Sequence, residues 1–238
     1  IGFIKAISLV MKSPVPTLIH GFTHAGNLIA ALISILTLSP LILTVTGMGR
    51  AYSLDGPREK LQRAFLWCFY KICIVMNAKL IVQNEDDRSF FIEMGAKLIY
   101  LTRGSGWQGS ELDVTAERQN RIGYFGRCDP LKGIDNFYNV AKYLRHRSDY
   151  EFVQFGHPGK GKYSADEIKV TASGFNVNYC GHTLSPSEEM LGCDIVVAPS
   201  RYREGFSNSI IEALCQGCKV CALKTSGVND LGDGKENL

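Results

Sequence analysis

Short runs rich in β-branched and other apolar residues alternate with longer segments in which apolar side chains recur every three to four positions. The first pattern is typical of buried strands and the second of helices. Strand, helix, strand is the unit of a parallel sheet. Residues 1–103 are therefore predicted to form a Rossmann-like α/β domain. Its strands are expected at residues 17–22, 41–46, 79–83 and 97–101, and its helices at residues 24–36, 58–77 and 86–95.

The same alternation begins again at residue 121, so a second Rossmann-like domain is predicted over residues 121–238. Residues 104–120, which combine glycines with a charged run, are predicted to cross between the domains. The fold class is therefore α/β. The chain starts at Ile1 rather than methionine and ends in an unfinished segment, so both domains are expected to be incomplete. The second set of strands is expected at residues 121–127, 151–155, 177–180, 194–198 and 219–223, and its helices at residues 132–144, 164–173, 186–191 and 207–217.

Composition narrows the class of protein. The chain has 238 residues, of which 45% are hydrophobic and 21% charged, as in folded globular proteins. A net charge of +3 gives no argument for nucleic-acid binding. Eight cysteines occur without a visible signal peptide, which favours reduced thiols in the cytoplasm. Cys215, Cys218 and Cys221 have the spacing of an iron–sulfur run, but no Cys-Pro follows, and buried small side chains are the favoured interpretation.

Two segments raise the question of a membrane. Residues 27–45 are apolar, but Ser39-Pro40 interrupts them, so a buried strand–helix–strand unit is favoured over a transmembrane helix. The helix expected at residues 58–77 is both basic and aromatic. Packing against the sheet is the favoured interpretation, and a location on a membrane surface is the alternative.

Two carboxylates stand eight positions apart where a strand gives way to a helix. Glu204 lies on the predicted loop and Glu212 on the predicted helix, pointing away from an apolar stripe of Ile210, Ile211 and Leu214. The N-terminal end of a helix favours anions and hydroxyl-rich ligands. The alternative is that Glu212 is a solvated side chain in an ordinary capping box with Ser209.

A second candidate segment joins the first strand of the second domain to its helix. It contains Gly126, Arg127 and Lys132. Ligands of open parallel sheets bind beyond the carboxyl ends of strands, where arginine and lysine could meet a diphosphate. The alternative is that these are surface bases beside an Asp-Pro helix start.

Together these motifs resemble those of retaining GT-B glycosyltransferases, family 4, also called glycosyl transferases group 1. The resemblance covers residues 121–227. It rests on Glu204-Gly205-Phe206 followed by Glu212-Ala213 and Gly217, on Gly126-Arg127 followed by Lys132-Gly133, and on Gly156 and Gly181 after strands.

The first half resembles a narrower branch, whose enzymes build bacterial surface polysaccharides on a lipid carrier. The matching segments are residues 20–23 (HGFT), 46–50 (TGMGR), 83–88 (QNEDDR) and 104–106 (GSG). The chain departs from the branch at Gly21, where a second histidine is common, and in lacking a lysine shortly after Thr23.

The resemblance implies a GT-B architecture, with an acceptor-binding and a donor-binding domain facing a cleft. It implies transfer of a hexosyl or N-acetylhexosaminyl group, with retention, from a UDP-sugar to a lipid-linked or saccharide acceptor, a GDP-sugar being the alternative donor. In the catalytic roles it implies, Glu204 meets the donor sugar hydroxyls, and Arg127 and Lys132 stabilise the departing diphosphate.

The remaining implied site residues bind substrate. Glu212 would bind the nucleotide ribose, with the backbone N–H groups of Phe206 and Ser207 nearby. No metal or cofactor is expected, and the implied location is the cytoplasm, with peripheral contact at the inner membrane. The other substrate-binding residues are Gly205, Asn208, Gly126, Gly156, Thr46 and Gly47.

Other functions stay open at this stage. A nucleotide-sugar epimerase of the same fold and a non-catalytic nucleotide-sugar-binding protein are the alternatives. A dehydrogenase is disfavoured because no G-x-G-x-x-G lies between a strand and a helix. His157 and His182 follow strand-end glycines and could touch the ligand, although loop histidines are more often structural.

Overall fold

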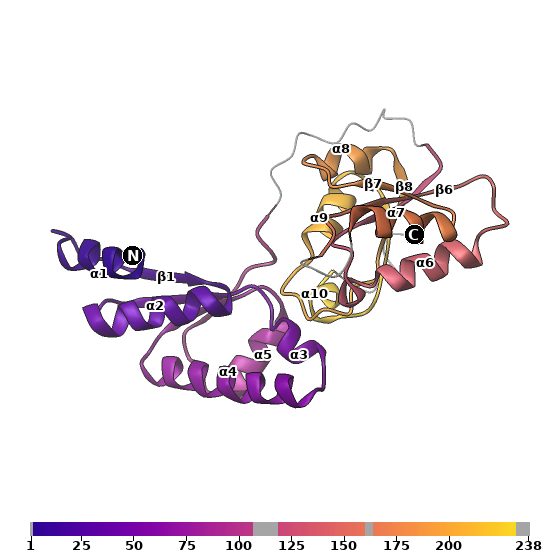
Figure 1. Cartoon of the computed structure of the whole chain (residues 1–238). Helices are drawn as coiled ribbons and strands as arrows, with labels where there is room; N and C mark the ends of the chain where they lie inside the picture. The colour runs from indigo at the N-terminus through magenta and orange to yellow at the C-terminus, as the bar shows by residue number, and fades with distance from the viewer. Residues whose placement is uncertain (1, 107–118, 160–163, 232–238) are drawn as a thin grey trace. The chain divides into compact units, whose positions relative to one another are not determined.

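The computed structural model describes residues 2–106, 119–159 and 164–231. The chain divides into two compact units, each built around its own parallel sheet (Figure 1). Most of the predicted crossing between domains, residues 104–120, lies outside the described residues. Unit 1 comprises Ile1–Ser105, Arg203–Phe206 and Asn229–Leu238, and unit 2 comprises Gly106–Tyr202 and Ser207–Val228.

Unit 1 contains a four-stranded parallel sheet in the order β1-β2-β3-β4. Right-handed crossovers between consecutive parallel strands place the connecting helices on one face, and Figure 1 shows α2, α4 and α5 on the same side of the strands. The strands are β1 (Ile19–Phe22), β2 (Leu41–Val45), β3 (Lys79–Val82) and β4 (Ile99–Leu101). The helices are α1 (Gly2–Met11), α2 (Thr23–Thr37), α3 (Arg50–Ser53), α4 (Pro57–Val75) and α5 (Glu85–Glu93).

The core of unit 1 lies between this sheet and its helices. Leu43 pairs in register with Leu80, and Val45 with Val82, and all four side chains are buried. The α4 helix packs on them through Leu66, Tyr70 and Cys73, so the favoured interpretation of this helix is confirmed for that face. On its other face, however, the large apolar side chains of Leu61, Phe65, Trp67, Ile72 and Val75 are exposed.

Residues 27–45 form most of α2, a turn and β2, which confirms the strand–helix–strand interpretation. Among the described residues, no helix combines the length and the apolar character that crossing a membrane requires.

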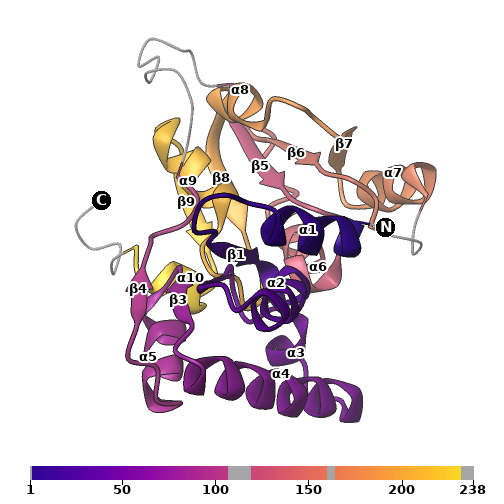
Figure 2. The same cartoon turned by 90° about the vertical axis from the view of Figure 1, so that its left-hand side faces the viewer.

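Unit 2 contains a five-stranded parallel sheet in the order β7-β6-β5-β8-β9, and β5 lies between β6 and β8 in Figure 2. The strand order therefore reverses direction at β5. In open α/β sheets such a switch point opens a crevice at the carboxyl ends of the strands. The strands are β5 (Arg121–Phe125), β6 (Glu151–Phe155), β7 (Val177–Gly181), β8 (Cys193–Ala198) and β9 (Lys219–Ala222).

Two separate apolar clusters fill the two faces of this sheet. Helices α6 (Ile134–Tyr143) and α7 (Ala165–Gly174) pack on one cluster. Helices α8 (Pro186–Leu191) and α9 (Asn208–Cys215) supply Met190 and Ala213 to the other. The remaining elements are the short helix η1 (Pro130–Lys132) and α10 (Ser226–Asn229).

Three details of the prediction for unit 2 were wrong, namely one helix start and the burial of two side chains. The helix expected from residue 132 begins at Ile134, because Gly133 adopts a left-handed conformation with φ 77° that separates it from η1. Leu214, placed in the apolar stripe of α9, is 44% exposed, whereas Ala213 is buried. Of the three closely spaced cysteines, Cys218 is buried as expected, but Cys221 is exposed.

Candidate functional site

A pocket of about 260 Å³ opens in unit 2 at the carboxyl ends of its central strands. Four predicted site residues come together in it, namely Gly126 and Arg127 after β5, Gly156 after β6, and Glu212 on α9. The rest of the lining is Phe125, Phe155, His157, His182, Thr183, Pro186, Met190 and Ser209.

Close approach of two strand ends shapes the floor of the pocket. The Gly126 N–H donates to the Phe155 carbonyl at 3.0 Å, and the Gly156 N–H donates to the Gly181 carbonyl at 2.8 Å. A Cβ atom at Gly156 would overlap the Gly126 carbonyl oxygen. The Tyr124 hydroxyl holds the next turn by donating to the Arg127 carbonyl at 2.8 Å. These contacts fix the backbone around Arg127, which lines the pocket.

Glu212 is a partly buried pocket residue rather than a solvated one. Burial raises its pKa above the ordinary value of 4.5. The alternative capping box with Ser209 is not formed, since Ser207 is the N-cap residue of α9 and makes no side-chain cap bond. Instead, the Ser207 and Ser209 hydroxyl oxygens lie 3.1 Å apart. Asn208 is the exposed first residue of the helix.

Replacing Glu212 by glutamine is expected to raise the thermal midpoint of the nucleotide-free protein at neutral pH. Because the pKa of Glu212 is raised in the folded state, wild-type stability falls as the pH increases from about 4.5 through the folded-state value. Glutamine does not titrate, so its advantage should be absent at acidic pH and complete at neutral pH. Thermal unfolding of both proteins at about pH 4 and pH 7 measures this difference. An equal gap at the two pH values would contradict the assignment.

Lys132 is placed differently from Arg127. It ends η1, whose start is capped by the Asp129 carboxylate accepting from the Leu131 N–H at 2.9 Å. Its Nζ lies 5.6 Å from the centre of the Tyr202 ring. Lys132 does not line the pocket in the part of the chain that the structure describes. The structure therefore brings Arg127, but not Lys132, into the pocket with Glu212.

The other predicted residues gather in unit 1. Gly205 donates its N–H to the Thr46 carbonyl at 2.9 Å. Gly47 has φ 123°, and a Cβ atom there would come within 2.6 Å of the Glu204 carbonyl carbon. Thr46, Gly47, Glu204, Gly205 and Phe206 therefore form one cluster, made by two backbone segments in close contact.

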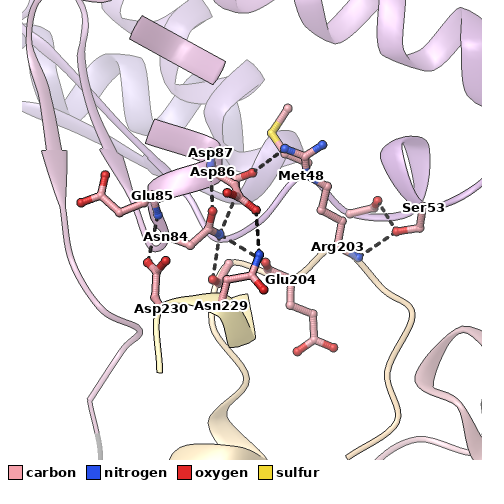
Figure 3. Close-up of polar contacts among 12 residues, drawn as sticks. Met48, Ser53, Asn84, Glu85, Asp86, Asp87, Arg203, Glu204, Asn229 and Asp230 are labelled. Atoms are coloured by element: carbon pink, nitrogen blue, oxygen red, sulfur yellow. Dashed lines mark hydrogen bonds and ion pairs between the residues drawn. The ribbon is translucent and has the colours of Figure 1, made fainter. Parts of the chain in front are cut away.

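Polar side chains that were not predicted as site residues surround this cluster. Asn84 donates to the carbonyl oxygens of Glu204 and Gly205, and the Asp87 carboxylate pairs with Arg203 (Figure 3). Asn84 and Asp87 belong to the QNEDDR segment. This segment resembles the polysaccharide branch, but the resemblance did not indicate a role for either residue. In the pocket of unit 2, the rings of His157 and His182 lie edge to face with their centres 6.0 Å apart, a pairing that the sequence did not predict.

Among the residues that the structure describes, no group of three or more histidine, cysteine, aspartate or glutamate side chains is arranged to hold a metal ion. No disulfide joins any of the cysteines in the described ranges.

A parallel sheet whose pocket lies beyond the carboxyl ends of the strands at a switch point is the arrangement of doubly wound α/β proteins. Within that class, residues 119–238 match the family model described as Glycosyl transferases group 1. The match covers half of the chain, and the protein belongs to this family.

Two curated proteins share part of the sequence. An uncharacterized 42.6 kDa protein in the cps region of Klebsiella pneumoniae is 27% identical over 121 residues, which cover 50% of this chain and 30% of that protein. The D-inositol 3-phosphate glycosyltransferase of Corynebacterium jeikeium is 27% identical over 201 residues, covering 69% of this chain and 46% of that enzyme. The chain thus spans less than half the length of either relative.

Among solved structures, Anabaena HepE in complex with UDP and glucose has a TM-score of 0.73 at 18% identity. The match covers 97% of this chain and 65% of HepE. The predicted fold class is confirmed, because the parallel α/β architecture matches that of GT-B glycosyltransferase structures.

Proposed function

We propose that the protein is a glycosyltransferase that moves a hexosyl or N-acetylhexosaminyl group from a UDP-sugar, with retention at the anomeric carbon. The observation that carries this proposal is the pocket of unit 2, which Arg127 and Glu212 both line at the carboxyl ends of the strands. Family membership and the UDP and glucose bound to HepE support the donor class.

The pocket offers complementary groups for a nucleotide diphosphate. Arg127 supplies a planar, permanently charged fork that suits phosphate oxygens. Glu212 supplies carboxylate oxygens that can accept bonds from the two ribose hydroxyls. The glycines at positions 126 and 156 let the two strand ends approach each other closely, and both residues line the pocket. Together these groups favour a nucleoside diphosphate over a simple sugar.

In the proposed reaction, the bond between the anomeric carbon and the β-phosphate oxygen breaks, and a bond to the acceptor oxygen forms. The acceptor proton passes to a phosphate oxygen of the departing UDP. Arg127 and Lys132 stabilise the negative charge that grows on the diphosphate. Glu204 holds the hydroxyls of the donor sugar.

We propose a lipid-linked or saccharide acceptor in surface polysaccharide synthesis, used at the cytoplasmic face of the inner membrane. Residues 1–103 are assigned to acceptor binding and residues 121–238 to donor binding. The similarity to a protein of a cps region supports the polysaccharide role. The exposed apolar face of α4, with Phe65 and Trp67, supports peripheral contact with lipid.

Calorimetric titration with UDP-, GDP- and ADP-sugars tests the donor site. Binding of the UDP-sugar is expected, and it should weaken by at least about 1 kcal/mol in both Glu212→Ala and Lys132→Ala. No binding of any nucleotide sugar, or binding indifferent to both changes, would overturn the donor-site assignment.

Product analysis then separates the classes of function. Release of UDP that requires an acceptor, with the α or β configuration of the donor kept in the product, is the expected result. A sugar altered without an acceptor would indicate an epimerase. Binding without any turnover would indicate a non-catalytic protein.

A further inference from the structure

We propose that Asn84 and Asp87 are positioning residues, which hold the backbone of Arg203–Phe206 so that Glu204 can meet the donor sugar. This inference rests on the proposed function, since it concerns the role given to Glu204. Neither residue touches substrate in this proposal. Both act through the segment that carries Glu204, which belongs to unit 1 together with them.

Asn84 contacts the segment directly. Its Nδ2 group lies 2.8 Å from the Gly205 carbonyl oxygen and 3.3 Å from the Glu204 carbonyl oxygen. Its Oδ1 atom accepts from the Asp87 N–H at 2.7 Å, which caps the start of α5. The side chain is 0% exposed. Asn84 therefore ties two consecutive carbonyl groups to a fixed helix end.

Asp87 holds the residue just before Glu204. Its carboxylate is 0% exposed and lies 3.3 Å from the Arg203 guanidinium. Burial raises the pKa of Asp87, while Arg203 and Asn84 act in the opposite direction by stabilising the charged carboxylate. A buried charge is costly without such partners. The pair therefore specifies where Arg203 must lie.

Backbone hydrogen bonds also hold the residues on both sides of Glu204. The Arg203 N–H donates to the Ser53 hydroxyl at 2.8 Å, and the Arg203 carbonyl accepts from the Gly49 N–H at 2.9 Å. On the other side, the Gly205 N–H donates to the Thr46 carbonyl. Figure 3 shows the Glu204 side chain directed away from Asn84 and Asp87. These contacts therefore fix the main chain of Arg203–Phe206, while the Glu204 carboxylate points away from Asn84 and Asp87.

No side chain larger than hydrogen fits at the centre of this arrangement. A Cβ atom at Gly205 would overlap the Gln83 side-chain oxygen and lie 2.7 Å from the Thr46 carbonyl. The backbone of this segment therefore packs directly against the backbone at Thr46. A small shift of the segment would produce steric clashes, because no free space surrounds it. Loss of the Asn84 amide is expected to displace Glu204.

The test uses Asn84→Ser in the full protein. Serine is a good N-cap, so it can still accept from the Asp87 N–H, but its short hydroxyl cannot bridge to the Glu204 and Gly205 carbonyls. UDP, which lacks the sugar, should bind within about twofold of wild type, whereas kcat with the UDP-sugar should fall by about 10- to 100-fold. The affinity gain of the UDP-sugar over UDP should be lost.

A second variant and a control make the result decisive. Asp87→Asn, which keeps the shape of the side chain but removes its charge, should show the same split between UDP and UDP-sugar. Arg88→Ala is the control, because Arg88 lies on the same helix and pairs with Glu85 at an exposed position. It should match wild type in every measurement.

Two results would overturn the inference. One is a wild-type kcat and wild-type sugar preference in both Asn84→Ser and Asp87→Asn. The other is an equal loss of UDP and UDP-sugar binding, which would mean that these residues serve stability alone. Failure of the proposed function is distinguishable, since the wild-type protein would then show no binding of UDP-sugar.

Discussion

Arg127→Ala is expected to lower kcat for sugar transfer by about 100- to 1,000-fold, equivalent to about 2.7–4 kcal/mol of lost transition-state stabilisation. Arg127 lines the pocket of unit 2, on a turn held by the Tyr124 hydroxyl. The charge on the diphosphate grows as its bond to the sugar breaks, so the guanidinium contributes more in the transition state than in the ground state. Steady-state measurement of UDP release with an acceptor present gives kcat and KM separately.

The matched control is Arg147→Ala. Arg147 is an arginine of the same unit, but its side chain is 52% exposed and pairs with Asp149. Exposed pairs of this kind contribute little, so the control should keep wild-type kcat. If Arg127→Ala were also to keep kcat within about threefold, the role assigned to this arginine would be wrong.

The fold could be predicted from the sequence because its strands and helices carry different local patterns. The segments at residues 151–155 and 186–191 have the predicted bounds in β6 and α8. Glycine follows each of them, and Pro186 starts the helix. The residues that end or start an element and the apolar periodicity therefore indicate the same boundaries. Where both signals coincide, no tertiary information is needed.

Other features depend on contacts that periodicity does not carry. The α1 helix carries apolar side chains at helical spacing, but none of its residues is buried, so the pattern alone does not show what the helix packs against. The α9 helix buries Ala213 rather than Leu214, because the face that packs is chosen by its neighbours α8 and β8 and not by hydrophobicity alone. Cys221 is exposed for a different reason, since successive side chains of the short β9 strand point to opposite faces.

Some residues of the candidate site could likewise be predicted from the sequence, and others could not. Gly126, Arg127 and Gly156 could be expected together, because the carboxyl ends of adjacent parallel strands lie at one edge of a sheet. Asn84 and Asp87 could not, since their partners lie 121 and 116 positions later in the chain. No spacing rule connects residues so far apart, and the pairing is visible only in the folded structure.

Gly156→Ala is expected to lower the free energy of unfolding by about 3 kcal/mol, at the upper end of the range for overpacked sites. The added Cβ would overlap the Gly126 carbonyl oxygen, which is backbone and cannot rotate away. Relief requires β5 and β6 to separate at their carboxyl ends, where the Gly126 N–H bonds the Phe155 carbonyl. Urea unfolding measures the loss, with the slope of the transition showing whether the unfolded state has changed.

The control for this prediction is Gly174→Ala in the same unit. Gly174 ends α7, and a Cβ atom there would meet nothing within 4 Å. Alanine at a helical position reduces the freedom of the unfolded chain, so a gain of up to about 1 kcal/mol is expected. Because the strand ends that separate in Gly156→Ala also line the pocket, this variant should lose UDP affinity along with stability, whereas Gly174→Ala should keep it. Equal stability of the two variants would show that the backbone at Gly126 and Gly156 can move apart at little cost in free energy. Gly156 would then not be needed for the shape of the pocket.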